Sequence, residues 1–245
     1  MQYSFDHISF EAYYRTPNMH KHFAKHIIFA LEGTLKCKVN DDEFECGGVI
    51  IQSDVLHTVD IDNPPMLVYL IDETCNRAKT LDEMYLQDNP YAVLDNDICK
   101  RVISTIKSCE SKVDIEILKI CGLDKGGDIE YDERIKDVLD MIEGSETLEA
   151  GIMGDLCGIA FLSESRLSHL FRKQVGISIA SYIMFSKLIK AYKYMLLGEN
   201  ITQAAIHSGF SSSSHFATVN KKLFGISTKE LGSIQDIFKS AEKCK

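Results

Sequence analysis

The sequence predicts an α+β chain of more than one domain: a small antiparallel β-structure, then a helical segment, then an all-helical part. Three observations support this. Short segments rich in β-branched and aromatic residues, separated by turn signals, occupy the first 75 residues. Apolar residues at helical spacing replace them after about Asp95. Further along, a stretch of 23 residues recurs at an offset of 49.

Length and composition are those of a globular protein. The 245 residues are 45% hydrophobic and 26% charged, enough for two domains that each bury a core. No stretch approaches 18 uncharged apolar residues, and the N-terminus has no cationic start followed by an apolar run. The eight cysteines never form a C-x-x-C pair, which indicates reduced, mostly buried thiols. We therefore expect a cytoplasmic protein with no membrane partner.

Charge is distributed unevenly along the chain. The net charge is −9, but residues 146–245 carry 12 Lys and Arg against 8 Asp and Glu. The excess of bases disappears if the count begins at Asp128. Charge alone is thus a weak indication that the two parts of the chain have different functions. Any argument for nucleic-acid binding must come from the residue pattern.

Residues 1–94 are predicted to form the β-domain. The strand-length segments are HIIFALEG, TLKCKVN, EFEC, GGVIIQ, HTVDI and MLVYLI. Turn signals such as Asn40-Asp41-Asp42 and Asn63-Pro64-Pro65 separate them. Short strands at this regular spacing predict a small antiparallel barrel or sandwich.

Residues 95–127 are predicted to form a helical linker that also dimerises. Ile98, Val102 and Ile106 fall on one face of a helix in this segment. We expect this face to pair two chains, although the same stripe could instead pack on the barrel.

Residues 128–245 contain the internal repeat. Segment 156–178 aligns with segment 205–227, and each copy predicts a first helix, a turn and a second helix with a capped start. The caps are Ser163 and Ser212, whose hydroxyls suit the free N–H groups of a helix start. A long helix links the copies. This is the helix-turn-helix pattern, and the alternative is a plain helical domain that arose by duplication.

At these residues the sequence resembles the AraC/XylS family of bacterial transcription regulators. The motif residues lie in LCGIAFLSESRLSHLFRKQVGIS (156–178) and in ITQAAIHSGFSSSSHFATVNKKLFGIS (201–227). The resemblance covers roughly residues 130–232. It implies a double helix-turn-helix module with both recognition helices in successive major grooves. The function it implies is that of a ligand-responsive, sequence-specific DNA-binding regulator, which is not an enzyme.

The same resemblance implies the partners and the roles of single residues. Double-stranded DNA, RNA polymerase, a second copy of the chain and an unidentified small-molecule effector are the expected partners. The base-facing residues are Ser165, Ser168, His169, Ser213, Ser214 and Thr218. Residues placed near phosphates are Arg166, Arg172, Lys173, Lys221 and Lys222, which fits their charge.

Three positions of the second copy depart from the family pattern: Thr218, Asn220, and the position after Ser227, where the family commonly has Pro. Thr218 stands where the family commonly has Arg or another long side chain, and short hydroxyls reach base edges less well. The first copy is therefore predicted to carry most of the sequence discrimination. Asn220 stands on the apolar stripe, so it is either hydrogen-bonded or rotated to the edge; our hypothesis is that it loosens the second copy.

A second group of candidate residues lies in the β-domain. His20, His22, His26 and the later His57 resemble the two cupin motifs, with His26 in the place of the usual acid. This resemblance implies a cupin-like barrel. Four imidazoles suit a divalent transition metal such as Zn, Fe, Ni or Cu. Three interpretations stay open: histidines that rim a pocket for an organic effector, a metal-sensing regulator, and a cupin metalloenzyme.

Overall fold

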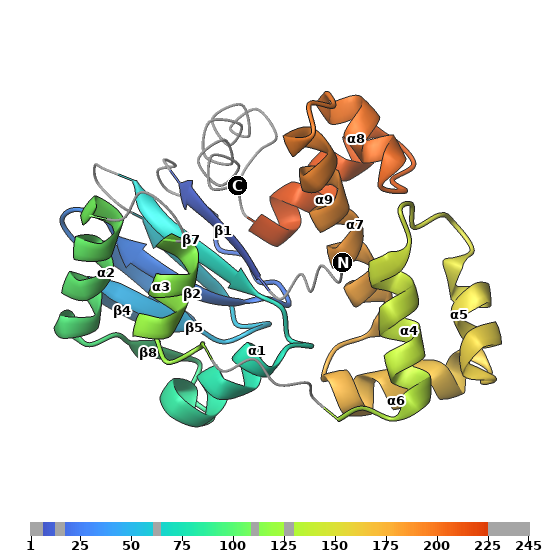
Figure 1. Ribbon diagram of the computed structural model, residues 1–245, viewed down its shortest axis with the longest axis horizontal. Coiled ribbons are helices and arrows are strands. Elements are labelled where there is room, and N and C mark those ends of the chain that lie inside the picture. Colours follow the sequence, from blue (N-terminus) through green and yellow to red (C-terminus); the bar gives the residue numbers. More distant parts are fainter. Residues whose placement is uncertain (1–6, 13–17, 61–64, 109–112, 125–129, 225–245) are drawn as a thin grey trace. The chain divides into compact units, whose positions relative to one another are not determined.

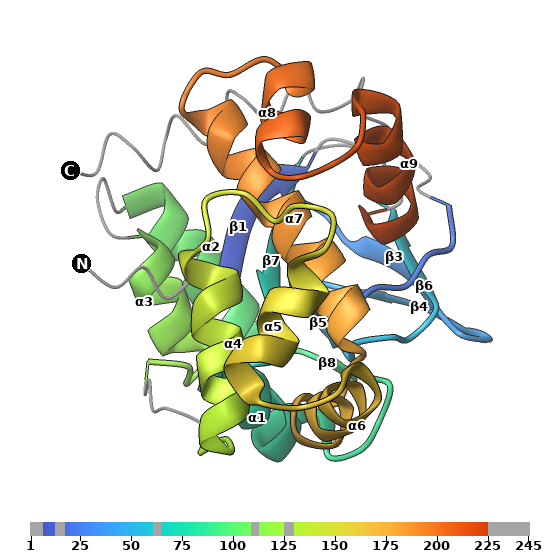
Figure 2. The same cartoon turned by 90° about the vertical axis from the view of Figure 1, so that its right-hand side faces the viewer.

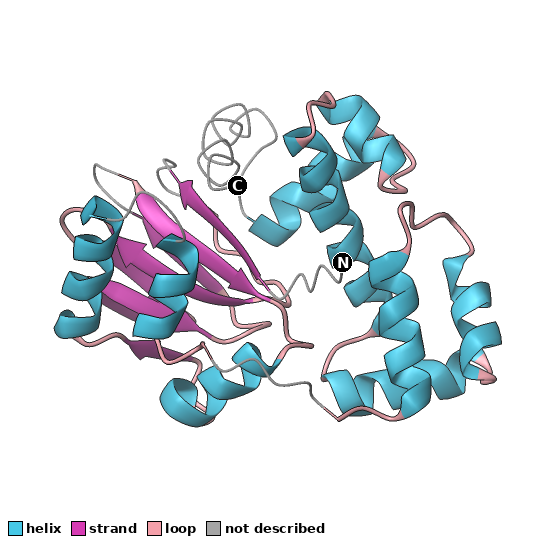
Figure 3. Ribbon diagram, viewed as in Figure 1, coloured by secondary structure: helices cyan, strands magenta, loops and turns pink. Residues whose placement is uncertain are grey.

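The structure is a computed structural model that describes residues 7–12, 18–60, 65–108, 113–124 and 130–224. Its contacts divide the chain into two units: residues 1–128 are grouped with 222–245 as the first, and residues 129–221 form the second. All described strands lie in the first unit, the sheet domain, and the second, the helical unit, contains only helices (Figures 1 and 3). The predicted α+β class is therefore confirmed.

The sheet domain contains eight described strands in two antiparallel sheets. Five strands pair in the order β1-β7-β2-β5-β8, and three in the order β4-β3-β6. Their bounds are β1 His7–Ala12, β2 Lys25–Ala30, β3 Leu35–Val39, β4 Asp42–Cys46, β5 Gly48–Ile51, β6 His57–Asp60, β7 Met66–Ile71 and β8 Tyr91–Val93. The six predicted strands are among them. The described pairings do not join the two sheets into a closed barrel, so closure stays a prediction.

The central strands of the larger sheet are covered on both faces. Every residue of β2, β5 and β7 is buried, which requires packing partners on each side because side chains alternate along a strand. On one face, Ile27 and Phe29 of β2 belong to a core cluster shared with helices. On the other face, His26 contacts His57 of the smaller sheet.

Four short helical segments cover the first of these faces. They are α1 (Asn76–Leu81), the π-helical turn η1 (Asp82–Leu86), α2 (Asn96–Ser108) and α3 (Val113–Ile120). The sequence pattern predicts α2 and α3 but not α1 and η1, because residues 76–86 bury only Ala78, Leu81 and Leu86. Three buried apolar residues in eleven give no clear helical period.

The face predicted to dimerise packs within the sheet domain. Val102 is fully buried in the cluster that covers the sheet, and Ile98 and Ile106 are half-buried against the same cluster. This placement corresponds to the alternative raised from the sequence, in which the stripe packs on the β-structure. Pairing of two chains through this face stays a prediction.

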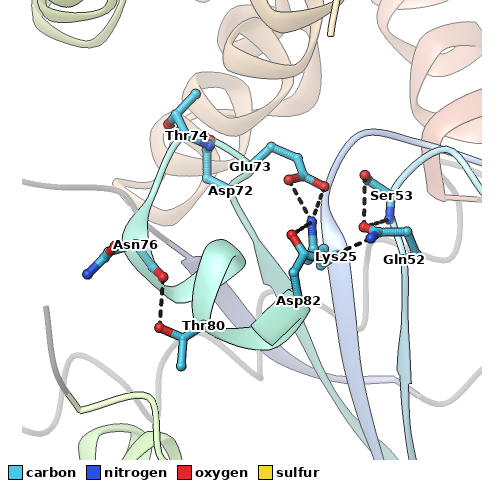
Figure 4. Close-up of polar contacts among 9 residues, drawn as sticks. All are labelled: Lys25, Gln52, Ser53, Asp72, Glu73, Thr74, Asn76, Thr80 and Asp82. Carbon is cyan, nitrogen blue, oxygen red and sulfur yellow. Dashed lines mark hydrogen bonds and ion pairs between the residues drawn. The ribbon is translucent and has the colours of Figure 1, made fainter. Parts of the chain in front are cut away.

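A buried lysine of β2 forms ion pairs that link η1 to the sheet. Lys25, at the start of β2, is 2% exposed, and its Nζ donates to both carboxylate oxygens of Glu73 at 2.6 and 2.7 Å. Its Nζ also lies 3.3 Å from Asp82 Oδ2, and Gln52 Nε2 donates to Asp82 Oδ1 at 2.8 Å. Figure 4 shows Lys25 between the two acids. The group is satisfied as a network, as a buried charge requires.

The helical unit holds six helices. They are α4 (Glu133–Gly144), α5 (Ile152–Ala160), α6 (Glu164–Val175), α7 (Ile179–Leu196), α8 (Ile201–His207) and α9 (Ser213–Phe224). A core cluster joins α4, α5, α6 and the start of α7 around Phe171. Phe216 packs edge-on against Phe210 and Tyr192, which joins α9 to the later part of α7. No helix in the described part of the chain has the length and hydropathy needed to cross a bilayer.

The Lys25 network yields a stability prediction. Replacing Lys25 with Met leaves Glu73, whose side chain is 13% exposed, without its cation, so we expect a loss of about 3–5 kcal/mol in the free energy of unfolding. Lys21→Met is the matched control, because Lys21 and Asp54 form an ion pair with side chains 55% and 60% exposed. The control should cost less than about 1 kcal/mol. Urea unfolding of both variants measures the difference, and equal losses would contradict the prediction.

Candidate functional site

Both predicted helix-turn-helix units are present. The first consists of α5 and α6, and the second of α8 and α9, with α7 between them (Figure 2). At 18 residues, α7 is about 27 Å long. The α8 start is fixed by a capping box between Asn200 and Gln203. The predicted cap of α9 is confirmed, since Ser212 Oγ accepts from the His215 N–H at 3.0 Å. Ser163 holds the N-cap position of α6, but its hydroxyl makes no capping bond.

The turn between α8 and α9, in the second helix-turn-helix, depends on Gly209. Its φ is +96°, and a Cβ at this position would lie 2.1 Å from the carbonyl oxygen of Leu148, in the loop between α4 and α5. The Gly209 carbonyl in turn accepts from Lys187 Nζ of α7 at 2.8 Å. A glycine is therefore required at this position. Through it, the second helix-turn-helix contacts both the α4–α5 loop and the linking helix α7.

The outer face of α6 carries the residues predicted to contact DNA. Leu167, Phe171 and Val175 are buried, which fixes the opposite side of the helix outward. On that side, Ser165, Ser168, His169 and Arg172 follow the spacing i, i+3, i+4, i+7 and so form one row. All are exposed except Ser168, which is half-buried, and Arg166 and Lys173 are exposed beside the row.

The repeat offset places a matching row on α9. It consists of Ser214, Ala217, Thr218 and Lys221, of which Ala217 is half-buried and the others are exposed. Ser213, predicted to face bases, aligns with Glu164 and lies one position before the row; Lys222 is exposed beside it. Ala217 is absent from the predicted set, although the alignment of the two copies points to it. Its methyl group suits apolar contact with a thymine methyl.

The hydroxyl of Thr218 is partly used by its own helix. Thr218 Oγ1 donates to the Ser214 carbonyl at 3.0 Å, so its proton is not available to a base, whereas its lone pairs and methyl group are. At the matching position, the α6 row instead offers the imidazole of His169. Stronger sequence discrimination by the first helix-turn-helix stays a prediction.

Asn220 is buried and hydrogen-bonded. Its side-chain oxygen accepts from the hydroxyl of Tyr192, a residue of α7 that is also buried. Of the two placements considered from the sequence, the hydrogen-bonded one is confirmed. A satisfied amide does not carry the cost of an unpaired one, which removes the reason for expecting Asn220 to loosen the second unit.

The four predicted histidines of the sheet domain lie together. His20 pairs with His57 as an isolated β-bridge, and His26 belongs to β2. Ring centroids are 4.5 Å apart for His20 and His57, 4.3 Å for His22 and His26, and 4.7 Å for His26 and His57. The ligand atoms of His20, His22 and His57 lie within 4.8 Å of one another. His20 is half-buried and the other three are buried.

Burial keeps these imidazoles neutral. It lowers the pKa of His57 to about 4 and that of His20 below its ordinary value. Burial also lowers the pKa values of His22 and His26 well below the ordinary range, and neighbouring histidines of the cluster add to the effect. A neutral imidazole keeps a nitrogen lone pair, which is the form that binds a metal ion.

Hydrogen bonds fix the tautomers of two of the rings. His57 Nδ1 lies 2.9 Å from the Val55 carbonyl, and His20 Nδ1 lies 2.9 Å from the Asn18 carbonyl. A carbonyl only accepts, so each Nδ1 carries the proton and each Nε2 carries a lone pair. Within the described residues, the buried Nε2 of His57 and Nδ1 of His26 have no hydrogen-bond partner.

Comparisons of sequence support the interpretation of the helical unit. Residues 156–232 match the family profile described as a helix-turn-helix domain. The probable transcriptional regulator LumQ of Photobacterium leiognathi is 28% identical over 103 residues, which are 40% of this chain and 42% of LumQ. The match thus spans about two fifths of that relative.

Solved structures with a similar fold cover almost the whole chain. ToxT from Vibrio cholerae O395 matches with a TM-score of 0.60 at 14% identity, over 94% of this chain and 98% of that one. Wild-type ToxT of strain SCE256 with a bound unsaturated fatty acid matches with a TM-score of 0.58 at 16% identity, over 96% and 97%. At such identities the likeness concerns the fold. Together with the helix-turn-helix match, it confirms the resemblance to AraC/XylS regulators.

Gly209 offers a direct test of the second turn. We expect Gly209→Ala to lower the free energy of unfolding by about 2 kcal/mol or more, because the new Cβ meets the Leu148 carbonyl and the backbone is left-handed. Gly158→Ala in α5 is the control: its Cβ enters open space within a helix, so a gain of about 0.5–1 kcal/mol is expected. Thermal unfolding compares the two, and a Gly209→Ala variant as stable as the parent would refute the argument.

The Tyr192–Asn220 bond is testable by a double-mutant cycle. Tyr192→Phe removes the donor, and Asn220→Leu removes the acceptor. We expect each change to destabilise the helical unit and the pair to show a coupling energy of about 1 kcal/mol. Unfolding of the parent, both single variants and the double variant gives this number. Additive losses would mean that the hydrogen bond contributes nothing.

Proposed function

We propose that the chain is a ligand-responsive regulator that binds specific DNA sequences through α6 and α9. The observation that carries this proposal is the pair of matched outward rows, one on each second helix of a duplicated helix-turn-helix. A plain helical domain would also expose polar side chains, but it would not need the cationic pair Arg172–Lys173 to recur as Lys221–Lys222. The matches to a helix-turn-helix family and to a probable transcriptional regulator support it.

Within each row, some residues contact bases and others contact phosphates. Ser165, Ser168 and His169 of α6 contact base edges, and Arg172 with its neighbours Arg166 and Lys173 contacts phosphates. On α9, Ser213, Ser214 and Thr218 contact base edges together with Ala217, and Lys221 and Lys222 contact phosphates. Side chains that touch phosphates position the protein, and those that touch bases give the specificity.

The sheet domain is proposed to bind the effector. A small molecule bound there would regulate DNA binding only if it binds two arrangements of the chain with different affinity. The fatty acid bound by ToxT shows that a protein of this fold takes a small apolar acid. A homodimer, contact with RNA polymerase and a cytoplasmic location belong to the same proposal.

A metal-dependent enzyme is the alternative from another class. It would need the four-histidine cluster to hold an ion with an open coordination position for a substrate. Oxygen consumption by metal-loaded protein would favour it. The chain matches a helix-turn-helix family profile and one probable transcriptional regulator, which favours sensing.

DNA binding tests the proposal at single residues. Fluorescence anisotropy at about 150 mM salt compares the region upstream of the gene with scrambled DNA of equal length. We expect His169→Ala to weaken binding to the upstream DNA by about 1–3 kcal/mol and to change binding to scrambled DNA little. Arg172→Ala should weaken binding to both DNAs and lower the salt slope by about 1.

The matched control is Lys100→Ala, which removes one exposed cation from α2 of the sheet domain. It should leave affinity and salt slope at the parent values. Equal competition by scrambled DNA would refute specific binding. An Arg172→Ala variant that binds as the parent does would refute the phosphate contact assigned to Arg172.

A further inference from the structure

We propose that His20, His22, His26 and His57 bind one divalent transition-metal ion, with zinc the best fit, and that this ion clamps the two sheets of the sheet domain together. The site goes beyond DNA binding and does not depend on it. Four steps support the assignment: the elements that bring the rings together, the free nitrogen atoms, the choice of ion and the closed shell.

The four histidines come from separate segments that the backbone already fixes. His26 lies on β2 of the five-stranded sheet, and His57 begins β6 of the three-stranded sheet. His20 exchanges two backbone hydrogen bonds of 2.9 Å with His57, and the His22 carbonyl accepts from the Asp54 N–H at 2.7 Å. An ion at their centre would therefore cross-link both sheets and the segment that precedes β2. Rings held in this way need little reorganisation to bind it.

The nitrogen atoms meet the requirements of ligands. The Nδ1–H groups of His20 and His57 are held by backbone carbonyls, which is how protein scaffolds commonly orient a metal-binding imidazole. This leaves Nε2 for the ion, and the Nε2 of His57 is buried with no partner among the described residues. A buried polar atom left unpaired costs about 1–3 kcal/mol, which a metal bond would remove.

The spacing is close to that of a tetrahedral centre. Ligands about 2.05 Å from zinc are about 3.3 Å apart. His22 Nε2 and His26 Nε2 are 3.0 Å apart, and the atoms of His20, His22 and His57 lie within 4.8 Å of one another. His26 adjoins this group through its contact with His22, and the wider separations require the rings to rotate towards the ion. An ion would replace the His22–His26 hydrogen bond with two stronger bonds.

The donor set selects the class of ion. Calcium and magnesium prefer oxygen ligands, whereas imidazole suits zinc, copper, nickel and iron. Four protein ligands fill a tetrahedral shell and leave no position for a substrate, which is the pattern of structural zinc sites. This distinguishes the clamp from a metalloenzyme centre. His20 is the one half-buried member of the four, so the ion would enter on its side.

The experiment uses the full chain purified without a histidine tag and stripped with a chelator. We expect one equivalent of Co²⁺ to give the strong visible absorption of a tetrahedral centre and Zn²⁺ to displace it. Elemental analysis should find one ion per chain, and Zn²⁺ should raise the melting temperature by at least about 5 °C. None of these readouts involves DNA, so failure here leaves the proposed regulation untouched.

Two variants locate the ion. His57→Gln should lose at least about 100-fold in Co²⁺ affinity while circular dichroism shows a folded chain. His207→Gln is the matched control, because His207 lies on α8 of the helical unit and pairs with Glu199. It should bind Co²⁺ as the parent does.

Three outcomes would overturn the assignment. One is the absence of a stoichiometric ion together with unchanged melting in Zn²⁺, Co²⁺, Ni²⁺, Cu²⁺ or Fe²⁺, which the parent chain alone reveals. Another is a His57→Gln variant that binds Co²⁺ like the control. The third is an intense sulfur-to-cobalt charge-transfer band, which would place the ion at the buried pair Cys37 and Cys46, whose sulfur atoms are 3.8 Å apart.

Discussion

The approach of Gly209 to the Leu148 carbonyl is the contact on which the geometry of the helical unit depends. Leu148 lies in the loop before the first helix-turn-helix, and Gly209 lies in the turn of the second. Because the two backbones touch, neither unit can shift along α7 without losing this contact. The Lys187 bond to the same glycine adds the linking helix to the junction. Under the proposed function, both second helices bind one DNA duplex, and this requires such a fixed relation because half-site spacing on DNA is itself fixed.

Periodicity made most of the fold predictable. The six predicted strands have the β-branched and aromatic residues and the turn signals of a sheet, and the repeat shows both helix-turn-helix units. The α1–η1 segment was not predicted from the sequence. It packs through three residues and changes from α to π geometry after Leu81, so no single period describes it. Pairing between distant strands, which decides whether a sheet closes, is not encoded in the period of any one strand. The predicted barrel is therefore the least supported part of the fold.

Site residues were predictable from the sequence where the residue type itself indicates a chemical role, such as metal binding. Four histidines in motif positions are conspicuous in sequence, and the structure brings their rings together. Ala217 was missed because a methyl group suggests no contact, although the offset of the repeat places it in the row. The partner of Asn220 is 28 residues away on another helix, so only tertiary structure identifies Tyr192. Val102 shows the reverse case: a helical stripe specifies burial but not what it is buried against.

The buried Tyr192–Asn220 hydrogen bond also determines which residues α9 exposes to solvent. Apolar side chains tolerate rotation of a helix, because one contact of similar volume replaces another, whereas a hydrogen bond has one geometry. Turning α9 by a single residue, about 100°, would separate the amide from the tyrosine hydroxyl. The same rotation would carry Ser214, Thr218 and Lys221 away from the surface they share. An interior amide thus sets the angle at which this helix presents its outer row, so one polar atom in the core governs which side chains this face exposes.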